Sequence, residues 1–176
     1  MRPPASWRMS CVVPAVSMQG PSLLLRRLAE AGVEFVVVGG FAGTLHGSSL
    51  LTNDIDVCAA LSAENVERLR RALADLSPVH CQTPGRLSFL EHPPTGVEVR
   101  NPYLETSAGI LDVLSSIPGV GDVERLKARA ITIPLYGQPV ALISLEDLIA
   151  AKESLGREKD LLAAKELRAI AAKRAT

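Results

Sequence analysis

Residues 36–58, VVVGGFAGTLHGSSLLTNDIDVC, constrain the fold more than any other stretch of the chain. A β-branched apolar run ends at Gly39-Gly40, a short segment follows, and a second apolar run contains Asp54 and Asp56. Apolar runs bounded by glycine are typical of buried strands. The segment between them is long enough for a helix of about two turns. The stretch therefore predicts a β-sheet that carries two acids within an otherwise buried strand.

The spacing of Asp54 and Asp56 predicts what these acids do. Residues two apart in a strand project from the same face, so the two carboxylates lie side by side. Adjacent carboxylates repel each other unless they share a proton or a cation lies between them. Mg²⁺ favours a few carboxylates together with substrate phosphates. We therefore expect a divalent cation at this strand.

Gly39-Gly40 predicts the phosphate side of the same site. The pair joins the first strand to the short helix, so its backbone amides and the positive end of that helix can face an anion. Because glycine has no Cβ, phosphate oxygens can approach the main chain closely. A phosphate cradle beside a metal-binding pair of acids indicates a nucleoside triphosphate site. Two metal ions there would clamp the attacking and leaving oxygens of a phosphoryl displacement.

A third acid is needed, because two carboxylates seldom hold two metal ions. Asp112, alone in the apolar run GILDVL (109–114), is the best candidate. Each feature also has a purely structural interpretation: Gly-Gly as a turn, Asp-x-Asp as a solvated strand end, Asp112 as an edge residue. The order of strand, Gly-Gly, helix, Asp-x-Asp strand and later acidic strand favours the functional one.

The rest of the chain predicts a single α/β domain over residues 20–176, preceded by a disordered tail over residues 1–19. We expect helices that end at Gly32 and Gly156, helix N-caps at Ser62 and Ser144, and a final helix over 159–173. A hairpin should turn at Gly137-Gln138. The further strands expected cover 33–38, 54–60 and 109–114, with short strands in a meander at 79–83, 86–91 and 96–100.

Composition limits the partners. Lys plus Arg and Asp plus Glu both total 19, so no global field attracts nucleic acid or a membrane. Aromatic residues make up 3%, which argues against an RNA-binding sheet built on stacking. No apolar stretch reaches the roughly 20 residues that span a bilayer. Cys11, Cys58 and Cys81 show no paired spacing, which fits a reducing compartment, and we expect a cytoplasmic protein.

The motif set resembles the nucleotidyltransferase superfamily that includes DNA polymerase β. Three segments resemble, more narrowly, bacterial nucleotidyltransferases of the AbiEii type, the toxins of type IV toxin–antitoxin systems. These segments are VVVGGFAGTLHGSSLLTNDID, GILDVLSSIPGVGDVERLKARAITIPLYGQPVALISLEDLIAAK and GREKDLLA. The resemblance covers roughly residues 20 to 170. It implies a polymerase-β-like α/β domain, with a mixed sheet flanked by helices and further helices at the C-terminus.

The resemblance also implies an activity. Members use Mg²⁺, with Mn²⁺ as an alternative ion, and a nucleoside triphosphate, and some add nucleotides to the 3′ end of tRNA. By position, the metal-binding and catalytic acids would be Asp54, Asp56 and Asp112. The residues on the nucleotide would be Gly39, Gly40, Thr52, Lys152, Lys159 and Asp160. A tRNA acceptor and a cognate antitoxin are the partners implied, and both rest on the resemblance and not on charge.

One position departs from the family pattern. Relatives carry arginine where this chain has Leu50, and leucine cannot make a bidentate phosphate contact. Either Arg86, Arg157 or Lys152 compensates, or the enzyme is weakened. Two alternatives to RNA transfer share the chemistry or the fold: an antitoxin-like transferase that nucleotidylates a protein, and an antibiotic-modifying transferase. A third, which Leu50 favours, is a nucleotide-binding module without turnover.

Overall fold

The computed structural model describes residues 20–176, so the tail predicted for residues 1–19 lies outside the described residues. Within the described range the chain forms a mixed α/β domain. Its elements are α1 (Pro21–Glu30), β1 (Phe35–Val38), α2 (Gly39–Leu45), β2 (Ile55–Ala59), α3 (Ala63–Leu73), β3 (Val79–His80), β4 (Tyr103–Thr106), β5 (Gly109–Leu114), β6 (Ser116–Ile117), β7 (Gly121–Asp122), α4 (Val123–Arg129), β8 (Ile131–Leu135), β9 (Gln138–Leu142), α5 (Leu145–Leu155) and α6 (Glu158–Arg174).

The main sheet has seven strands in the order β3-β4-β5-β2-β1-β9-β8, and β6 pairs with β7 in a separate ribbon. The β1–β9 and β2–β5 pairs are parallel, and the other pairs are antiparallel. The edge strands are β3, which is two residues long, and β8, which contains Pro134 opposite Pro139. The predicted mixed sheet flanked by helices is confirmed.

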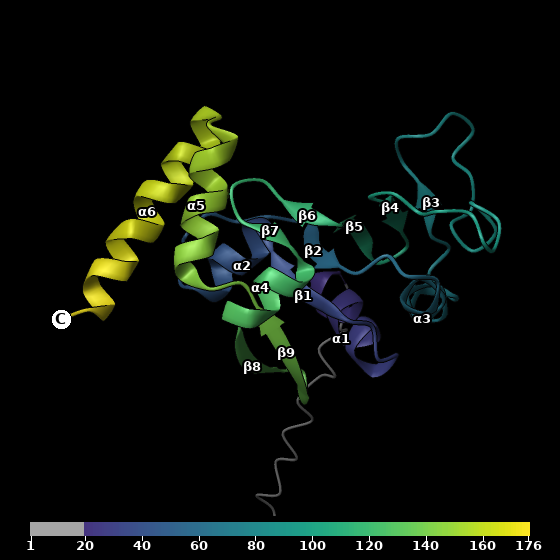
Figure 1. Cartoon of the computed structure of the whole chain (residues 1–176), viewed down its shortest axis with the longest axis horizontal. Coiled ribbons are helices and arrows are strands. Elements are labelled where there is room, and N and C mark those ends of the chain that lie inside the picture. Colours follow the sequence, from purple (N-terminus) through teal and green to yellow (C-terminus); the bar gives the residue numbers. More distant parts are fainter. Residues whose placement is uncertain (1–19) are drawn as a thin grey trace, which may run out of the picture.

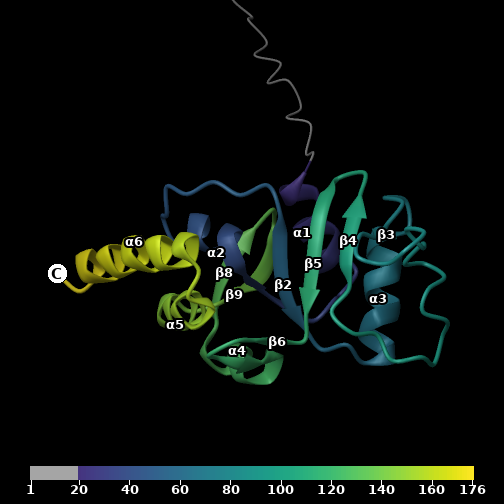
Figure 2. The same cartoon turned by 90° about the horizontal axis from the view of Figure 1, so that it is seen from above.

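The two faces of the sheet are covered differently. Leu111 and Val113 of β5 are fully buried on one face, where Leu24 of α1 packs close to Gly109. Asp112 and Leu114 lie on the opposite face and are only half-buried. Helices α5 and α6 lie side by side at one end of the molecule, and α3 lies at the other (Figures 1 and 2). Of the helices over residues 20–176, none has the length and apolar character needed to cross a bilayer.

The helix boundaries follow the expected caps. The Ser62 hydroxyl accepts a hydrogen bond from the Asn65 amide, and Ser144 accepts one from the Asp147 amide. These contacts satisfy amides that the first helical turn leaves without partners. Gly156 ends α5 in the left-handed conformation, with φ of 65°. The predictions for these three positions are confirmed.

The middle of the chain was predicted less well. Of the meander expected over 79–83, 86–91 and 96–100, only Val79–His80 forms a strand, and Ser88 adds a single bridge to Val79. The hairpin turn lies at Tyr136-Gly137, one residue before the predicted position, because both residues adopt positive φ. Such paired positive φ values are typical of a two-residue hairpin turn, which matches the twist of the strands it joins.

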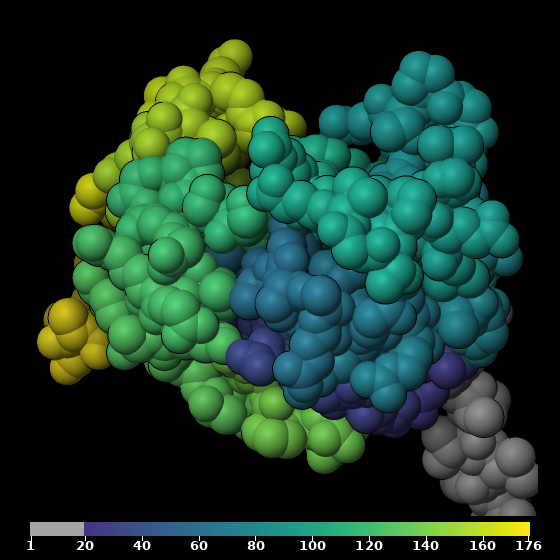
Figure 3. Space-filling view, turned by 45° about the vertical axis from the view of Figure 1, so that its right-hand side comes forward, coloured from purple at the N-terminus to yellow at the C-terminus, as the bar shows by residue number. Residues whose placement is uncertain are grey.

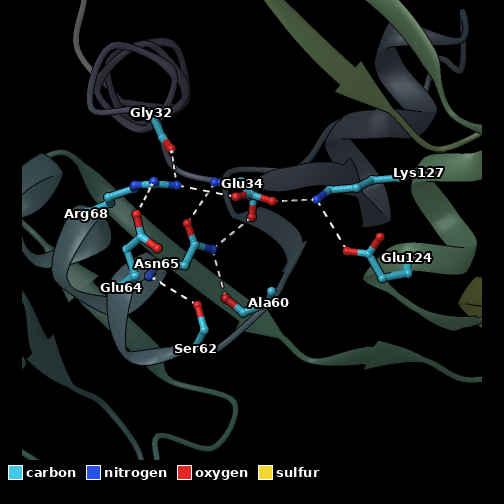
Figure 4. A network of polar contacts seen from close by, with 9 residues as sticks. All are labelled: Gly32, Glu34, Ala60, Ser62, Glu64, Asn65, Arg68, Glu124 and Lys127. Atoms are coloured by element: carbon cyan, nitrogen blue, oxygen red, sulfur yellow. Dashed lines mark hydrogen bonds and ion pairs between the residues drawn. The ribbon is translucent and has the colours of Figure 1, made fainter.

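A polar network holds the start of β1 against α3 and α4 (Figure 4). The side-chain NH₂ group of the buried Asn65 donates hydrogen bonds to the backbone carbonyls of Glu34 and Ala60. Its Oδ1 accepts a hydrogen bond from the backbone N–H of Glu34 at 2.8 Å. The Glu34 carboxylate accepts from Arg68 and from Lys127, the latter at 2.8 Å. The pKa of Glu34 is lowered chiefly by the hydrogen bond from Lys127. This network fixes the end of β1 opposite the site.

Candidate active site

Register places four side chains in a row across neighbouring strands. Val38 of β1 is opposite Asp56 of β2, Asp56 is opposite Asp112 of β5, and Asp112 is opposite Tyr103 of β4. Directly paired residues point to the same face of a sheet. The row lies on the face away from α1. It brings two of the predicted acids together from segments more than fifty residues apart in the sequence.

Gly39 and Gly40 make room for side chains of the site itself. A Cβ on Gly39 would lie 2.1 Å from Oδ2 of Asp56, and Gly39 has a φ of 66°. A Cβ on Gly40 would lie 3.1 Å from the Thr52 side chain. The sequence predicted that these glycines admit a phosphate. In the structure, their first consequence is that Asp56 and Thr52 can approach the main chain at the point where β1 becomes α2.

The acids of the row are in an unfavourable electrostatic environment. Burial raises the pKa of Asp56, and Asp54 raises it further, while Lys152 and the Gly40 amide lower it. Burial, with Asp56 and Asp54, raises the pKa of Asp112 to about 6. Like charges in a partly desolvated site oppose ionisation unless a cation compensates them. A bound cation would therefore stabilise the ionised acids, because nearby cationic side chains offset the burial and repulsion only in part.

Two cavities meet at this row. The smaller, of about 470 Å³, includes Gly40, Thr52, Asp54, the loop at Leu50-Leu51 and part of α6. The larger, of about 770 Å³, extends over Tyr103, the turn at 117–121 and α5. Both include Gly39, Asp56, Asp112, Lys152 and Arg157. Figure 3 shows the molecular surface hollowed between the yellow-green C-terminal helices and the teal middle segment.

Lys152 faces the acids from α5 and is itself held by Asp160. Asp160 is 1% exposed, and its carboxylate accepts from Lys152 at 3.1 Å and from Arg157. Burial alone would raise the pKa of Asp160, but the hydrogen bonds and charges of Arg157 and Lys152 lower it overall. Lys159, which the resemblance pairs with Asp160, is exposed and lines only the smaller cavity. The cations that contact Asp160 are therefore Lys152 and Arg157.

The loop between α2 and β2 is fastened to α6. The Glu166 carboxylate accepts from the hydroxyls of Ser48 and Ser49, at 2.6 and 2.7 Å, and from the Ser49 amide at 2.8 Å. Thr52 accepts a hydrogen bond from the Asp54 amide at 3.3 Å. Leu50 is 39% exposed and lines the smaller cavity. The position where the family pattern inferred from the resemblance has arginine thus faces the site.

The three cations proposed to replace that arginine lie in different places. Arg157 and Lys152 line both cavities. Arg86 lines neither, and it forms an ion pair with Glu105 of β4 at 2.7 Å. Of these three, Arg157 is the arginine that lines the same cavity as Leu50, and its guanidinium can contact a phosphate in two places.

His46 has a structural position. It is 2% exposed, its Nε2 lies 2.8 Å from the Ile143 carbonyl, and its own carbonyl accepts from Arg174 at 2.8 Å. Burial lowers its pKa. Arg168, another base of α6, forms an ion pair with Glu153. These bases of α6 are thus used in packing against α5 and α2.

Asp54, Asp56 and Asp112 offer the type of oxygen donor that a hard divalent cation prefers. Asp56 and Asp112 are adjacent acids, and Asp56 raises the pKa of Asp112. Asp54 directly precedes β2 and raises that pKa as well. Across residues 20–176, no three His, Cys, Asp or Glu side chains are already close enough together to hold a metal ion. Carboxylate oxygens are the ligands that Mg²⁺ and Mn²⁺ prefer. Asp56 and Asp112, which are register partners, could hold such an ion between them, with Asp54 as a further carboxylate nearby.

Tyr103, beside Asp112, was missed by the sequence analysis. Its segment, NPYLETSAGILD, was not interpreted as a hairpin, although Ser107-Ala108 is a two-residue connection between alternating runs. Pairing these runs would have placed Tyr103 opposite Asp112. The contribution of the turn at 117–121 to the larger cavity has no comparable signal in the sequence.

Comparison with known proteins identifies the fold. No protein-family model and no curated protein sequence matches the chain. Among solved structures, it is similar to a protein from Thermotoga maritima assigned as a nucleotidyltransferase, with a TM-score of 0.51 and 18% identity, over 85% of this chain and 91% of that one. At this identity the likeness concerns the fold. The chain therefore has a nucleotidyltransferase fold, as predicted.

Two other solved structures match with lower scores. One is ANT(2″)-Ia in complex with adenylyl-2″-tobramycin, with a TM-score of 0.44 and 16% identity, over 83% of this chain and 93% of that one. The other is an antigenic nucleotidyltransferase-like protein from Paracoccidioides brasiliensis, with a TM-score of 0.47 and 15% identity, over 86% of this chain and 76% of that one.

Proposed function

We propose that this protein is a Mg²⁺-dependent nucleotidyltransferase that moves a nucleoside monophosphate from a triphosphate to an acceptor hydroxyl. The observation that carries this proposal is the pairing of Asp56 with Asp112 on one face of the sheet, next to Gly39 and between two cavities. A paired set of acids at the junction of two cavities suits a reaction that joins two substrates. The similarity of fold supports the same class of reaction.

The chemistry assigns a role to each part of the site. The acceptor oxygen attacks the α-phosphorus, a P–O bond forms, the bond to the bridging oxygen of the β-phosphate breaks, and pyrophosphate leaves. Asp112 orients the attacking hydroxyl and takes its proton. Mg²⁺ bound to the acids would offset the negative charge that develops on the phosphoryl oxygens. Lys152 and Arg157 add positive charge from the wall that the two cavities share.

The acceptor proposed first is the 3′ end of an RNA, with tRNA as the most specific case. This choice follows the resemblance to AbiEii-type toxins, in which a cognate antitoxin would restrain the activity. The nucleotide would occupy the smaller cavity, which is lined by Gly40, Thr52 and Lys159. The site predicted from sequence is retained in this proposal, with Arg157 added to it.

A nucleotide-binding module without turnover is the second candidate, and Leu50 is the observation that favours it. Leu50 lies in the wall of the smaller cavity and supplies no charge there. Such a module would bind a triphosphate through Lys152 and Arg157 and release it unchanged. The row of acids argues for turnover, because binding alone does not require carboxylates whose pKa values are raised by burial and by one another.

A labelling experiment separates these functions. The purified protein is incubated with Mg²⁺ and each common nucleoside triphosphate, radiolabelled at the α-phosphate, with cellular RNA and cell-extract protein as separate acceptors. Asp54→Ala/Asp56→Ala is the inactive control, and Glu98→Ala, an exposed acid outside both cavities, is the matched control. Label on tRNA-sized RNA, lost only in the double variant, is the expected result. Label on protein would favour the antitoxin-like transferase, and binding without label the module.

A further inference from the structure

We propose that the larger cavity is the acceptor site, and that it receives an uncharged, hydroxyl-bearing group with a planar or apolar face, held beside Tyr103. This inference rests on the proposed function, because it assigns the second substrate of the same reaction. It concerns the cleft between β4, the turn at 117–121 and α5.

The direction of the reaction separates the two cavities. In a displacement at phosphorus, the attacking and leaving oxygens lie on opposite sides of the phosphoryl group. Gly40, Thr52 and Asp54 line only the smaller cavity, which is where the triphosphate and its leaving pyrophosphate belong. The acceptor must then approach the shared wall from the other side. The larger cavity opens on that side and reaches Asp112 directly.

The lining of the larger cavity defines the kind of acceptor. Outside the wall shared by the two cavities, its side chains are uncharged. Leu114, Ile117, Val120, Leu148 and Leu155 supply apolar surface, and Asn101, Tyr103 and Ser116 supply polar groups. Its volume of about 770 Å³ is within the range of small-molecule sites and can hold a nucleoside-sized body. A phosphate placed in this part would lose its hydration without gaining a cation, whereas an uncharged body would not.

Tyr103 is positioned to contact the reacting end of that acceptor. It pairs directly with Asp112, so its ring stands beside the acid on the same face, and it is half-buried. Its backbone is fixed, because its carbonyl accepts from the Cys81 amide at 2.9 Å. Its hydroxyl makes no hydrogen bond within residues 20–176. Asn101, which also lines the cavity, is held in place because its Oδ1 accepts a hydrogen bond from the backbone N–H of Ser115 at 2.8 Å. The ring offers a face to a planar group and the hydroxyl offers a donor.

Two kinds of molecule carry an uncharged, hydroxyl-bearing group with a planar face: a free ribonucleoside and an RNA, through its terminal nucleoside. In the second case the terminal nucleoside enters the cleft and the preceding phosphates stay outside it. Recognition by the cleft would then depend little on salt, because few phosphates are neutralised. Both sources present the same hydroxyls to Asp112, so both can be offered to the protein as probes.

The test fills the cleft without touching the acids. Leu114→Trp places a large side chain two residues from Asp112 on the same face, and Val97→Trp places the same side chain at a position that is 55% exposed and lines neither cavity. Tyr103→Phe and Tyr103→Ala remove the hydroxyl and the ring. Binding of labelled nucleoside triphosphate is measured by equilibrium dialysis. Transfer is measured with adenosine and with a short RNA that has a free 3′ hydroxyl, and thermal unfolding verifies each fold.

We expect Leu114→Trp to bind the triphosphate within about twofold of wild type and to lose roughly a hundredfold in transfer, as removal of acceptor binding requires. Val97→Trp should match wild type. Tyr103→Phe should raise the acceptor KM severalfold and Tyr103→Ala more, with the triphosphate KM unchanged. The affinity for the RNA acceptor should fall with rising salt concentration less steeply than the neutralisation of about one phosphate would cause.

Other outcomes refute distinct statements. If Leu114→Trp loses triphosphate binding, the larger cavity holds the nucleotide, and the assignment is wrong. If it binds and transfers normally, the cleft is not used, and the assignment is also wrong. Label on protein but on neither probe would overturn the class of acceptor. A wild-type protein that binds no triphosphate, or labels nothing, would instead refute the proposed function, and the acceptor site with it.

Discussion

Lys152 Nζ lies 3.1 Å from Oδ1 of Asp160, so one of the two cations that face the acid row is held by a carboxylate that is 1% exposed. The contact joins α5 to α6 across the Gly156 break. Removing one partner of a buried ion pair leaves the other charge without compensation, which is costlier than the pair is favourable. The position of Lys152 in the site thus depends on a residue that lies behind it.

Asp160→Asn should therefore destabilise the protein in a pH-dependent way. The pKa of Asp160 is lowered in the folded state, so its carboxylate stabilises the fold above its unfolded pKa and loses this effect as pH falls through the folded pKa. We expect a loss of about 3 kcal/mol at pH 7 that shrinks below about pH 4. Urea unfolding over this pH range measures it. Glu153→Gln, which breaks the exposed pair with Arg168, should change stability little at any pH.

Gly39→Ala should impair both stability and activity. The added Cβ would meet Oδ2 of Asp56 at 2.1 Å, in a residue whose φ is 66°. Gly32→Ala is the matched control, because Gly32 has a φ of 69° and nothing within 4 Å of an added Cβ. Gly32→Ala should cost about 1 kcal/mol through backbone strain alone. Gly39→Ala should cost at least about 1 kcal/mol more, and equal losses would show that Asp56 yields freely.

Asp112→Asn should stabilise the metal-free protein while abolishing transfer. Burial and the charges of Asp56 and Asp54 raise the pKa of Asp112 to about 6, so at pH 7 its ionised form opposes folding. Allowing for partial exposure, removal of the charge should add about 1 kcal/mol and raise the Tm by a few degrees in EDTA. The gain should vanish below about pH 4. A lower Tm than wild type at pH 7 would contradict it.

Arg157→Leu should weaken triphosphate binding, because Arg157 lines both cavities while Leu50 supplies no charge. Loss of one charged contact should reduce affinity by roughly tenfold. If Arg157 replaces the missing arginine, Leu50→Arg should restore binding in the Arg157→Leu background. Equilibrium dialysis with labelled triphosphate measures both. Arg86→Leu should leave affinity unchanged, since Arg86 is paired with Glu105 outside the cavities.

Glu166→Ala should raise the KM for the triphosphate and leave the Tm nearly unchanged. Glu166 fastens Ser48 and Ser49, and with them the loop that carries Leu50, Thr52 and Asp54. Without this contact the loop samples other positions, and the binding-competent fraction falls. Initial rates at varied triphosphate concentration test this. The nearby Lys165→Ala is the control, and an unchanged KM in Glu166→Ala would show that the loop holds its place alone.

Local sequence signals predicted the parts of the fold that depend on neighbouring residues. The helices α3 and α5 begin and end where expected, with N-caps at Ser62 and Ser144 and a C-cap at Gly156. Caps and left-handed termini are set by a few adjacent residues, so they can be predicted locally. The strand 109–114 was predicted with its full extent. The strands expected at 86–91 and 96–100 did not form, and in these segments Phe89 and Val99 are buried while Leu87, Leu90 and Val97 are exposed. Phe89 is fully buried there without forming part of a strand.

The site divides in the same way. Gly39, Asp54, Asp56 and Asp112 could be singled out because their spacing or isolation is visible in the sequence. Tyr103 was not singled out, because its place opposite Asp112 follows from the register of the hairpin that turns at Ser107-Ala108, and that hairpin was not predicted. The contact of Asp160 with both Lys152 and Arg157 likewise arises only when α5 and α6 fold back on each other.

The edges of the sheet limit how the protein can associate. At one edge β3 offers only two residues, and at the other Pro134 removes a backbone donor from β8. A foreign strand therefore finds no continuous ladder to extend, which protects the chain against edge-to-edge aggregation. Stable complexes with other chains should form on helical or loop surfaces, and a tightly bound protein would leave the order of strands in the sheet unchanged.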